Sequence, residues 1–293
     1  MRVTTSQAQR AQLDYIQSNL QRLVKAQDQA ATGKRFQKGS EDPAAAADVL
    51  RADSTLAANT QYLRNGDLAI GRASEEDRVL NSLQLITERA RDLASQQANA
   101  TADAGTRLIA KAEVDQLIDA AIGLGNTRFN TGFLFGGTRE LEQPLTTTSP
   151  YMTSFVALGN PQYEVAAGQL SAPNHNAHEI FIATNVMQSL KNLSDALGAN
   201  NVPGITNAMP ALSAASDRVG QLLGETGARV NQYETIKSQL VVANLDTKVR
   251  KSMLYDIDLT DAAANFAQAQ SAYQAALSAA NRVLNLNVLD YLR

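Results

Sequence analysis

The sequence predicts a mainly α-helical protein, in which long antiparallel helices from both chain ends form a coiled-coil bundle with a small β-rich insertion at its tip. Three observations support this class. Aromatic residues make up only 5% of the 293 residues, although apolar residues reach 44%. Ala supplies ten of the nineteen residues from 262 to 280. Two heptad rows of apolar residues also lie near opposite chain ends. Since Ala favours helix but buries little area, such helices gain most from repeated seams.

The first element is a helix over residues 4–31 with a heptad row on one side. Its members recur at steps of three and four residues, and they are Leu13, Ile16, Leu20, Leu23, Gln27 and Ala30. Gly33 predicts the end of this helix, and two Gly and a Pro make residues 32–43 a turn. Asp42 as N-cap and Pro43 at the first helical position then predict a long helix to about residue 100.

The middle of the chain changes character. A helix is predicted over residues 106–124, and a β-hairpin over 125–138, where three Phe alternate with Gly and Thr. Residues 139–179 contain four Pro and little helical period, with weak strand candidates at 151–156 and 163–165. We expect a small β-rich insertion here, at the low end of what folds alone.

Helical patterns resume over residues 185–197, 205–251 and from 258 onward, where Asp258, Thr260 and Asp261 are possible N-caps. The last segment carries two adjacent heptad rows. One contains Phe266, Ala269, Tyr273, Ala276, Ala280 and Val283; the other contains Phe266, Gln270, Tyr273, Leu277, Ala280 and Leu284. If the two ends pair, the chain has a terminal coiled-coil domain from 1–40 plus 256–293. A helical rod domain with the β-hairpin follows from 41–138 plus 181–255, and the insertion domain is 139–180. Periodicity alone leaves an intramolecular coiled coil, as in a helical adaptor, equally open.

Composition excludes several functions. The chain has no Cys, which excludes disulfides, thiolate catalysis and thiolate metal sites. A net charge of −3 without a basic cluster argues against a nucleic-acid partner. No segment approaches the ~20 apolar residues of a membrane span, so no membrane partner is expected. Residues 1–10 lack the apolar core of a Sec-type signal peptide.

Neither a metal site nor a catalytic site is predicted. His175 and His178 lie three residues apart, but only Glu179 offers a further ligand nearby. Asp256, Asp258 and Asp261 lack the Gly and Glu that a calcium loop requires. No Ser–His–Asp order or Gly-x-Ser-x-Gly elbow is present, so we expect no enzyme, no catalytic residue and no cofactor.

Several short motifs, in the same order, resemble those of the bacterial flagellin superfamily. They are residues 32–35 (TGKR) with 40–44 (SEDPA), 89–94 (RARDLA) with 97–99 (QAN), and 126–132 (NTRFNTG). Together they span most of the chain outside residues 139–180. Within the superfamily, residues 133–138 (FLFGGT) and 258–263 (DLTDAA) resemble the type 3 hook-associated proteins, which join hook to filament. The residues after Pro144 and the segment 287–289 depart from that pattern, and a short flagellin that forms the filament itself is the alternative.

The resemblance implies a structural subunit of the extracellular flagellum at the hook–filament junction, transiently cytoplasmic before export. Its implied partners are copies of itself, hook-associated protein type 1, flagellin, an export chaperone and the type III export apparatus. We expect the terminal helices to fold on assembly, because thin Ala-rich seams are marginal alone. The predicted assembly seam comprises Leu13, Ile16, Leu20, Leu23, Phe266, Tyr273, Leu277, Val283, Leu284, Leu289 and Leu292. The chaperone-binding stripe is predicted at Phe266, Tyr273, Leu277 and Leu284.

Overall fold

The computed structural model describes residues 2–99, 102–148, 151 and 159–291, and for residues 2–6, 8–9 and 283–291 it describes the backbone. The protein is 75% helical, with long helices packed against each other and only small antiparallel sheets. The predicted fold class is therefore confirmed. The chain forms two compact units, one from Met1–Ala58 with Ala243–Arg293 and one from Asn59–Val242. The three-domain division stays a prediction.

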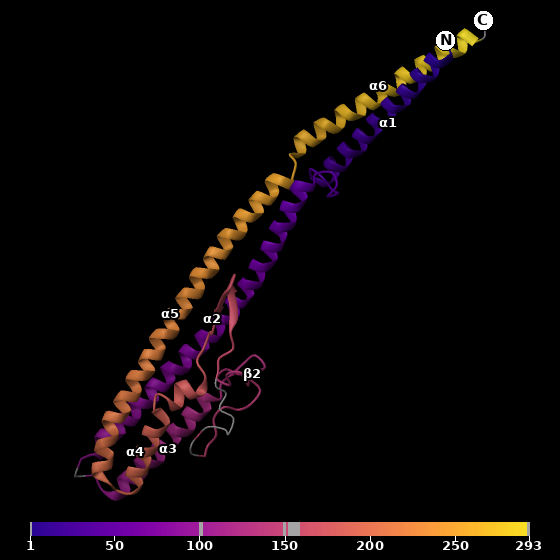
Figure 1. The fold of residues 1–293 in the computed structure, drawn as a ribbon. Coiled ribbons are helices and arrows are strands. Elements are labelled where there is room, and N and C mark those ends of the chain that lie inside the picture. The colour runs from indigo at the N-terminus through magenta and orange to yellow at the C-terminus, as the bar shows by residue number, and fades with distance from the viewer. Residues whose placement is uncertain (1, 100–101, 149–150, 152–158, 292–293) are drawn as a thin grey trace. The chain divides into compact units, whose positions relative to one another are not determined.

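In the first unit, both chain ends lie side by side as helices. Helix α1 (Arg2–Thr32) packs against α6 (Leu259–Tyr291), and Figure 1 shows the N- and C-termini at the same end of this pair. The first turns of α2 (Pro43–Gln97) and the last turns of α5 (Val202–Tyr255) complete the unit. A small core forms there from Phe36, Ala45 and Val49 together with Leu254 and Tyr255.

Helices α2 and α5 run antiparallel and contribute residues to both units. In the second unit, Lys237 Nζ lies 2.6 Å from Asp67 Oδ1. In the first, Lys251 Nζ lies 2.5 Å from Asp53 Oδ1. These cross-helix ion pairs mark the register of α2 against α5 within each unit.

The ends of the helices follow the predicted local signals. Asp42 caps α2, since the Ala45 N–H donates to Asp42 Oδ1 at 3.0 Å. Asp258 caps α6 in the same way, with the Thr260 N–H at 2.7 Å from Asp258 Oδ1. Gly33 ends α1 with a left-handed φ of 65°, which glycine adopts without strain.

The second unit contains the larger hydrophobic core. Helices α3 (Ala104–Gly125) and α4 (Val186–Gly198) pack against each other and against α2 and α5. Its largest fully buried side chains include Leu80, Leu83, Leu134, Phe135, Phe181, Leu190, Leu193 and Leu197. The rings of Phe135 and Phe181 meet edge to face with centroids 6.0 Å apart. Most of the buried hydrophobic residues in the described part of the chain therefore lie in this unit.

Two short antiparallel hairpins accompany these helices. The predicted hairpin is present as β1 (Arg128–Phe129) paired with β2 (Gly132–Phe133). The strand expected at 163–165 is β3 (Tyr163–Ala166), and it pairs with β4 (Gln169–Ser171), which the sequence did not indicate. The strand expected at 151–156 lies outside the described residues apart from Tyr151.

The C-terminal end of the insertion contains an element that was not predicted. There, η1 (His178–Ile182) is a π-helical turn, in which the Ala183 N–H donates to the His178 carbonyl at 2.8 Å. Ile180 and Phe181 are buried by this turn. The single turn is too short to produce a helical period in the sequence.

Candidate assembly surfaces

The helix pair of the first unit has a shielded row on each helix. On α1 the buried and half-buried positions recur at steps of three and four, and they include Ile16, Asn19, Leu23 and Ala26. On α6 the corresponding row is Ala262, Phe266, Ala269, Tyr273, Ala276 and Ala280. Four of these six α6 residues are Ala, so the seam between the two helices buries little apolar area.

The predicted assembly seam divides between this shielded row and the surface. Ile16, Leu23, Phe266 and Tyr273 lie in the shielded row. By contrast, Leu13 is 59% exposed, Leu20 42% and Leu277 38%. The side chains of Val283, Leu284 and Leu289, and all of Leu292, lie outside the described residues. Asn19 and Ala26 were not predicted, because a polar and a small residue give no hydrophobic signal.

Leu13 and Leu20 belong to an apolar stripe on α1 that also includes Val24, and all three are exposed within the unit. Leu20 and Val24 line a groove of about 610 Å³ beside the turn that carries Phe36. Charged side chains also line it, among them Lys25, Asp28, Lys38 and Glu41. Apolar side chains beside charged ones are typical of a protein–protein contact surface.

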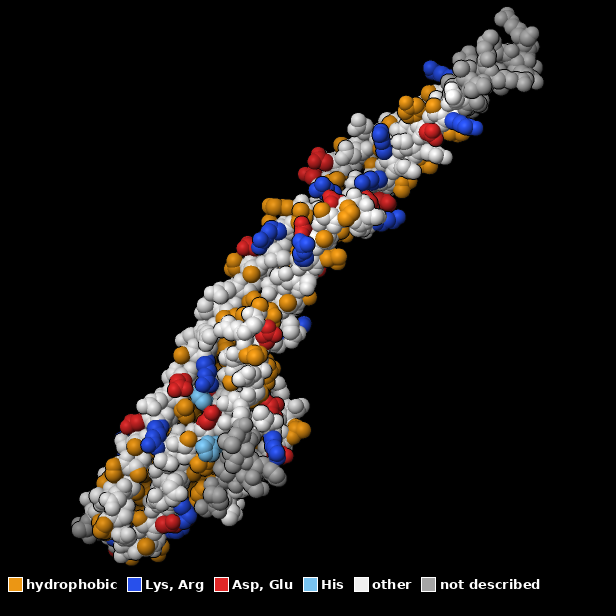
Figure 2. All heavy atoms as spheres, viewed as in Figure 1, with side chains coloured by type: hydrophobic (Ala, Val, Ile, Leu, Met, Phe, Trp, Pro, Cys, Tyr) orange, Lys and Arg blue, Asp and Glu red, His pale blue; other side chains and the backbone are white. Residues whose placement is uncertain are grey.

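Helix α5 presents a second exposed apolar stripe in the first unit. Leu245, Val249 and Met253 recur every four residues and are all exposed. Residues four apart lie on one helix face, so the three side chains form a continuous strip. On the face drawn in Figure 2, hydrophobic side chains alternate with Lys, Arg, Asp and Glu along the helices. This stripe was not predicted, although its four-residue spacing is visible in the sequence.

A clasp joins the two connections of the first unit, from α1 to α2 and from α5 to α6. The Arg35 N–H donates to the Tyr255 carbonyl at 2.7 Å, and the Ile257 N–H donates to the Gly33 carbonyl at 3.0 Å. Lys34 Nζ lies 2.6 Å from Asp256 Oδ1. This hydrogen bond lowers the pKa of Asp256 and raises the pKa of Lys34. Because the pair is exposed, the backbone bonds hold the clasp more than the charges do.

The Asp and His residues that could suggest a metal site are used otherwise. Asp256 pairs with Lys34 and Asp258 caps α6, as described above. His175 is buried in a polar network of the second unit, where its Nδ1 lies 2.7 Å from Glu76 Oε1. Across the described part of the chain, no group of three or more His, Cys, Asp and Glu side chains is placed to hold a metal ion.

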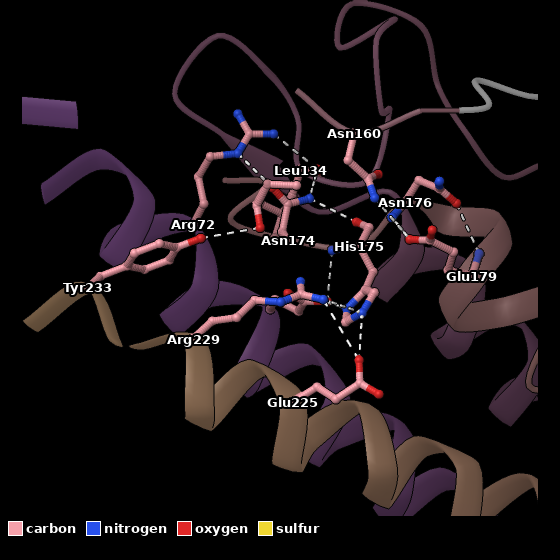
Figure 3. A network of polar contacts seen from close by, with 12 residues as sticks. Arg72, Leu134, Asn160, Asn174, His175, Asn176, Glu179, Glu225, Arg229 and Tyr233 are labelled. Carbon is pink, nitrogen blue, oxygen red and sulfur yellow. Dashed lines mark hydrogen bonds and ion pairs between the residues drawn. The ribbon is translucent and has the colours of Figure 1, made fainter. Parts of the chain in front are cut away.

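The same network fastens the insertion to α2 through Arg72 (Figure 3). Arg72 is buried, and its Nε donates to Asn174 Oδ1 at 2.9 Å while Nη2 donates to the Leu134 carbonyl at 3.2 Å. Glu140 supplies a counter-charge at 2.7 Å from Nη1. One guanidinium thus connects α2 to the residue that follows β2 and to the segment after β4, and its partners lie too far away in sequence to be predicted.

The four charged residues within residues 88–92 are exposed on the surface of the second unit. Arg89 Nη2 lies 2.6 Å from Glu113 Oε1 and connects α2 to α3, with both side chains exposed. Exposed pairs of this kind contribute about 0–1 kcal/mol. The pair therefore adds little to the packing of the two helices.

Comparison with known proteins gives these surfaces a context. Residues 3–140 match the bacterial flagellin N-terminal helical region. The flagellar hook-associated protein 3 of Salmonella typhimurium is 23% identical over 302 residues, which cover 94% of each chain. The flagellar filament core protein flaB2 of Brachyspira hyodysenteriae is 23% identical over 273 residues, covering 89% of this chain and 90% of the relative.

A solved structure shows the same fold. A flagellar hook-associated protein from Vibrio parahaemolyticus, described as putative, superposes with a TM-score of 0.64 and is 21% identical; the match covers 73% of this chain and 99% of that one. No helix in the described ranges is long and apolar enough to cross a membrane. The matched proteins are structural components of the flagellum. The similarity to them confirms the prediction that the chain is not an enzyme. The match of residues 3–140 to the bacterial flagellin N-terminal helical region and the similarity to these relatives therefore confirm the predicted resemblance of the chain to the flagellin superfamily, and within it to the type 3 hook-associated proteins.

Proposed function

We propose that this chain is a structural subunit of the bacterial flagellum that joins the hook to the flagellin filament. The alignment with hook-associated protein 3 over 94% of the chain carries the proposal. In this proposal, copies of the chain form a ring or short helical zone. That zone contacts hook-associated protein type 1 on the hook side and flagellin on the filament side.

The exposed apolar stripes of the first unit are the contact surfaces in this proposal. Leu13, Leu20 and Val24 on α1 are exposed in a single chain, and so are Leu245, Val249 and Met253 on α5. Burying such side chains against a neighbouring subunit stabilises association by about 25 cal/mol per Å² of apolar surface. A lattice offers every copy the same neighbours, so each stripe is covered once assembly is complete.

The terminal helices fold on assembly in this proposal. The shielded row on α6 is mostly Ala, and a two-helix seam of small residues is marginal in water. Before assembly, the chain leaves the cell unfolded through the type III export apparatus. Before export, a chaperone covers the stripe at Phe266, Tyr273, Leu277 and Leu284. Hydrogen exchange on the dilute monomer tests this step: α1 and α6 should exchange rapidly while Leu83 and Leu190 stay protected, and strong protection of both terminal helices would contradict it.

A gene deletion tests the function. Cells without the chain should carry bare hooks and release flagellin into the medium, because exported flagellin has nothing to attach to. Bare hooks without released flagellin would instead favour a filament subunit. The similarity to filament core protein flaB2 is the observation that favours this second candidate function.

Complementation of the deletion strain tests the surfaces separately. Replacing Leu13 and Leu20 by Gln should abolish filament attachment while leaving secretion of the variant intact. Both side chains are exposed in the single chain, so the change does not disturb its core. Ser18→Gln, at an exposed position of the same helix outside the stripe and the groove, is the matched control and should restore filaments. Normal filaments with the double variant would exclude this stripe from assembly.

A further inference from the structure

The most exposed large hydrophobic side chain in the described part of the chain lies in the second unit, shortly after β2. Leu141 is 81% exposed, and it stands between Glu140 and Glu142. A single exposed Leu is ordinary on a protein surface. What it can bind therefore depends on how the surrounding turn holds it.

The turn that carries this side chain, residues 136–142, is held in one shape and is called the Leu141 turn below. The Phe133 N–H of β2 donates to the Glu140 carbonyl at 2.6 Å. Gly132 permits this close approach, because a Cβ atom there would lie 2.8 Å from Glu140 Cβ. A partner that binds Leu141 therefore meets a backbone that is already ordered, which lowers the entropic cost of binding.

Two charges of opposite sign flank the exposed Leu. Glu140 Oε1 lies 2.7 Å from Nη1 of the buried Arg72, so this carboxylate is already paired. Arg139 Nη1 and Glu142 Oε2 lie 3.4 Å apart, and both side chains are half-exposed. Because exposed pairs of this kind contribute little, both charges are available to a partner.

The groove on α1 in the first unit has complementary chemistry. Its apolar lining comes from Leu20, Val24 and Phe36. The charged lining residues that already form ion pairs within the unit are Lys25, Lys34, Arg35 and Glu41. The other two, Asp28 and Lys38, are exposed and form no ion pair in the described part of the chain. The groove therefore offers an apolar surface with one free charge of each sign.

We propose that the Leu141 turn of one copy docks into the α1 groove of a neighbouring copy, with Leu141 against Leu20 and Val24. The contact rests on the proposed function, because it names two surfaces through which copies of the subunit meet. Both leucines and the valine are exposed in the single chain, so docking removes apolar surface from water on both sides.

Charge and size both support this occupant. Glu142 pairs with Lys38 across the contact, and Arg139 pairs with Asp28. The groove measures about 610 Å³, which lies in the range of cavities that enclose a small ligand, so it can receive one anchor side chain and its neighbours. In this contact Leu141 supplies the apolar burial, and the charges at the rim select its orientation.

The contact joins two different surfaces, so each copy offers one turn and one groove. A head-to-tail contact of this kind continues from copy to copy and builds a ring or a helix. A stripe that paired with its own counterpart would instead close after two copies. Because the groove includes α1, it forms when α1 folds, in agreement with the proposed folding of the terminal helices on assembly.

Engineered cysteines test the contact cleanly, since the chain has no Cys. Leu141→Cys and Val24→Cys are introduced together in the deletion strain, and isolated hook–filament complexes are treated with a mild oxidant. The double variant should give a ladder of disulfide-linked dimers, trimers and larger products of this chain. Each single variant should stay monomeric, and the two single variants expressed together should stop at the dimer.

Leu141→Cys combined with Tyr15→Cys is the matched control and should give no ladder. Tyr15 is exposed and lies about two and a half turns from Val24, on the opposite side of α1. An equal ladder in this control, or none from the Leu141→Cys and Val24→Cys pair, would overturn the contact. Immunogold labelling of the same complexes shows where the chain lies, so a failure of the contact is distinguishable from a failure of the proposed function.

A charge exchange provides a second test that needs no cysteine. Lys38→Glu and Glu142→Lys should each lower the number of attached filaments severalfold, because like charges then meet at every copy. The double variant restores the opposite charges and should restore the filaments. Full attachment with either single variant, or no recovery in the double variant, would overturn the proposal.

Discussion

Removing the hydroxyl group of Tyr233 tests the packing of α5 against the β3–β4 hairpin. Tyr233 is almost fully buried beside Ala69 and Val165. Its hydroxyl oxygen lies 2.8 Å from Ser171 Oγ, and its O–H donates to the Ala172 carbonyl at 3.2 Å. Tyr233→Phe keeps the ring and its contacts but breaks both hydrogen bonds, so it isolates their contribution.

The expected cost at pH 7 is about 1–2 kcal/mol in the free energy of unfolding, because each net hydrogen bond contributes about 0.5–1.5 kcal/mol. The effect also depends on pH. Burial raises the pKa of Tyr233 above its ordinary value, so the folded state holds this proton more tightly than the unfolded state. The stability from this proton is complete below about pH 10 and is lost as the pH rises through the folded pKa.

Urea unfolding followed by far-ultraviolet circular dichroism measures both effects. The wild type should lose more stability than Tyr233→Phe between pH 7 and about pH 10.5. Tyr15→Phe, at an exposed tyrosine of α1, is the control and should change neither value. A Tyr233→Phe variant within about 0.3 kcal/mol of the wild type at pH 7 would refute the contribution assigned to these hydrogen bonds.

Three further substitutions probe other contacts. Gly125→Ala places a methyl group onto the Leu145 side chain, which Asn126 holds through hydrogen bonds to its backbone, so it should destabilise the protein by about 1–3 kcal/mol in urea unfolding. Phe181→Ala empties a fully buried position and should cost about 3–5 kcal/mol in the same assay. Asp42→Ala removes the N-cap of α2 and should cost about 1 kcal/mol, with faster amide exchange in its first turn. An unchanged unfolding midpoint in any of the three variants would contradict the structural role that is assigned to the substituted residue.

Local chemistry made the element boundaries predictable. Asp42 and Pro43 predicted the start of α2, Asp258 predicted the start of α6, and the Phe-rich segment 125–138 predicted the β1–β2 hairpin. Each signal depends on residues within a few positions of each other, so it does not require a tertiary contact.

The phase of the α1 seam and the polar network were not predictable in the same way. Leu13 and Leu20 are the most hydrophobic choice for a heptad row, yet the shielded row of the single chain includes Asn19 and Ala26. Facing residues select the buried side of a helix, and α6 is more than 200 residues away in sequence. Likewise, Glu76 and His175 are 99 residues apart, so only the folded chain reveals their contact.

Localisation of the chain in isolated hook–filament complexes tests the central proposal most directly. Immunogold labelling with an antibody against this chain, viewed by negative-stain electron microscopy, shows the position of the chain directly. The measurement does not depend on the phenotype of a mutant strain. If the chain joins the hook to the filament, each complex should show a single labelled zone between the two. Label along the whole filament would contradict the junction role and would assign the chain to the filament itself.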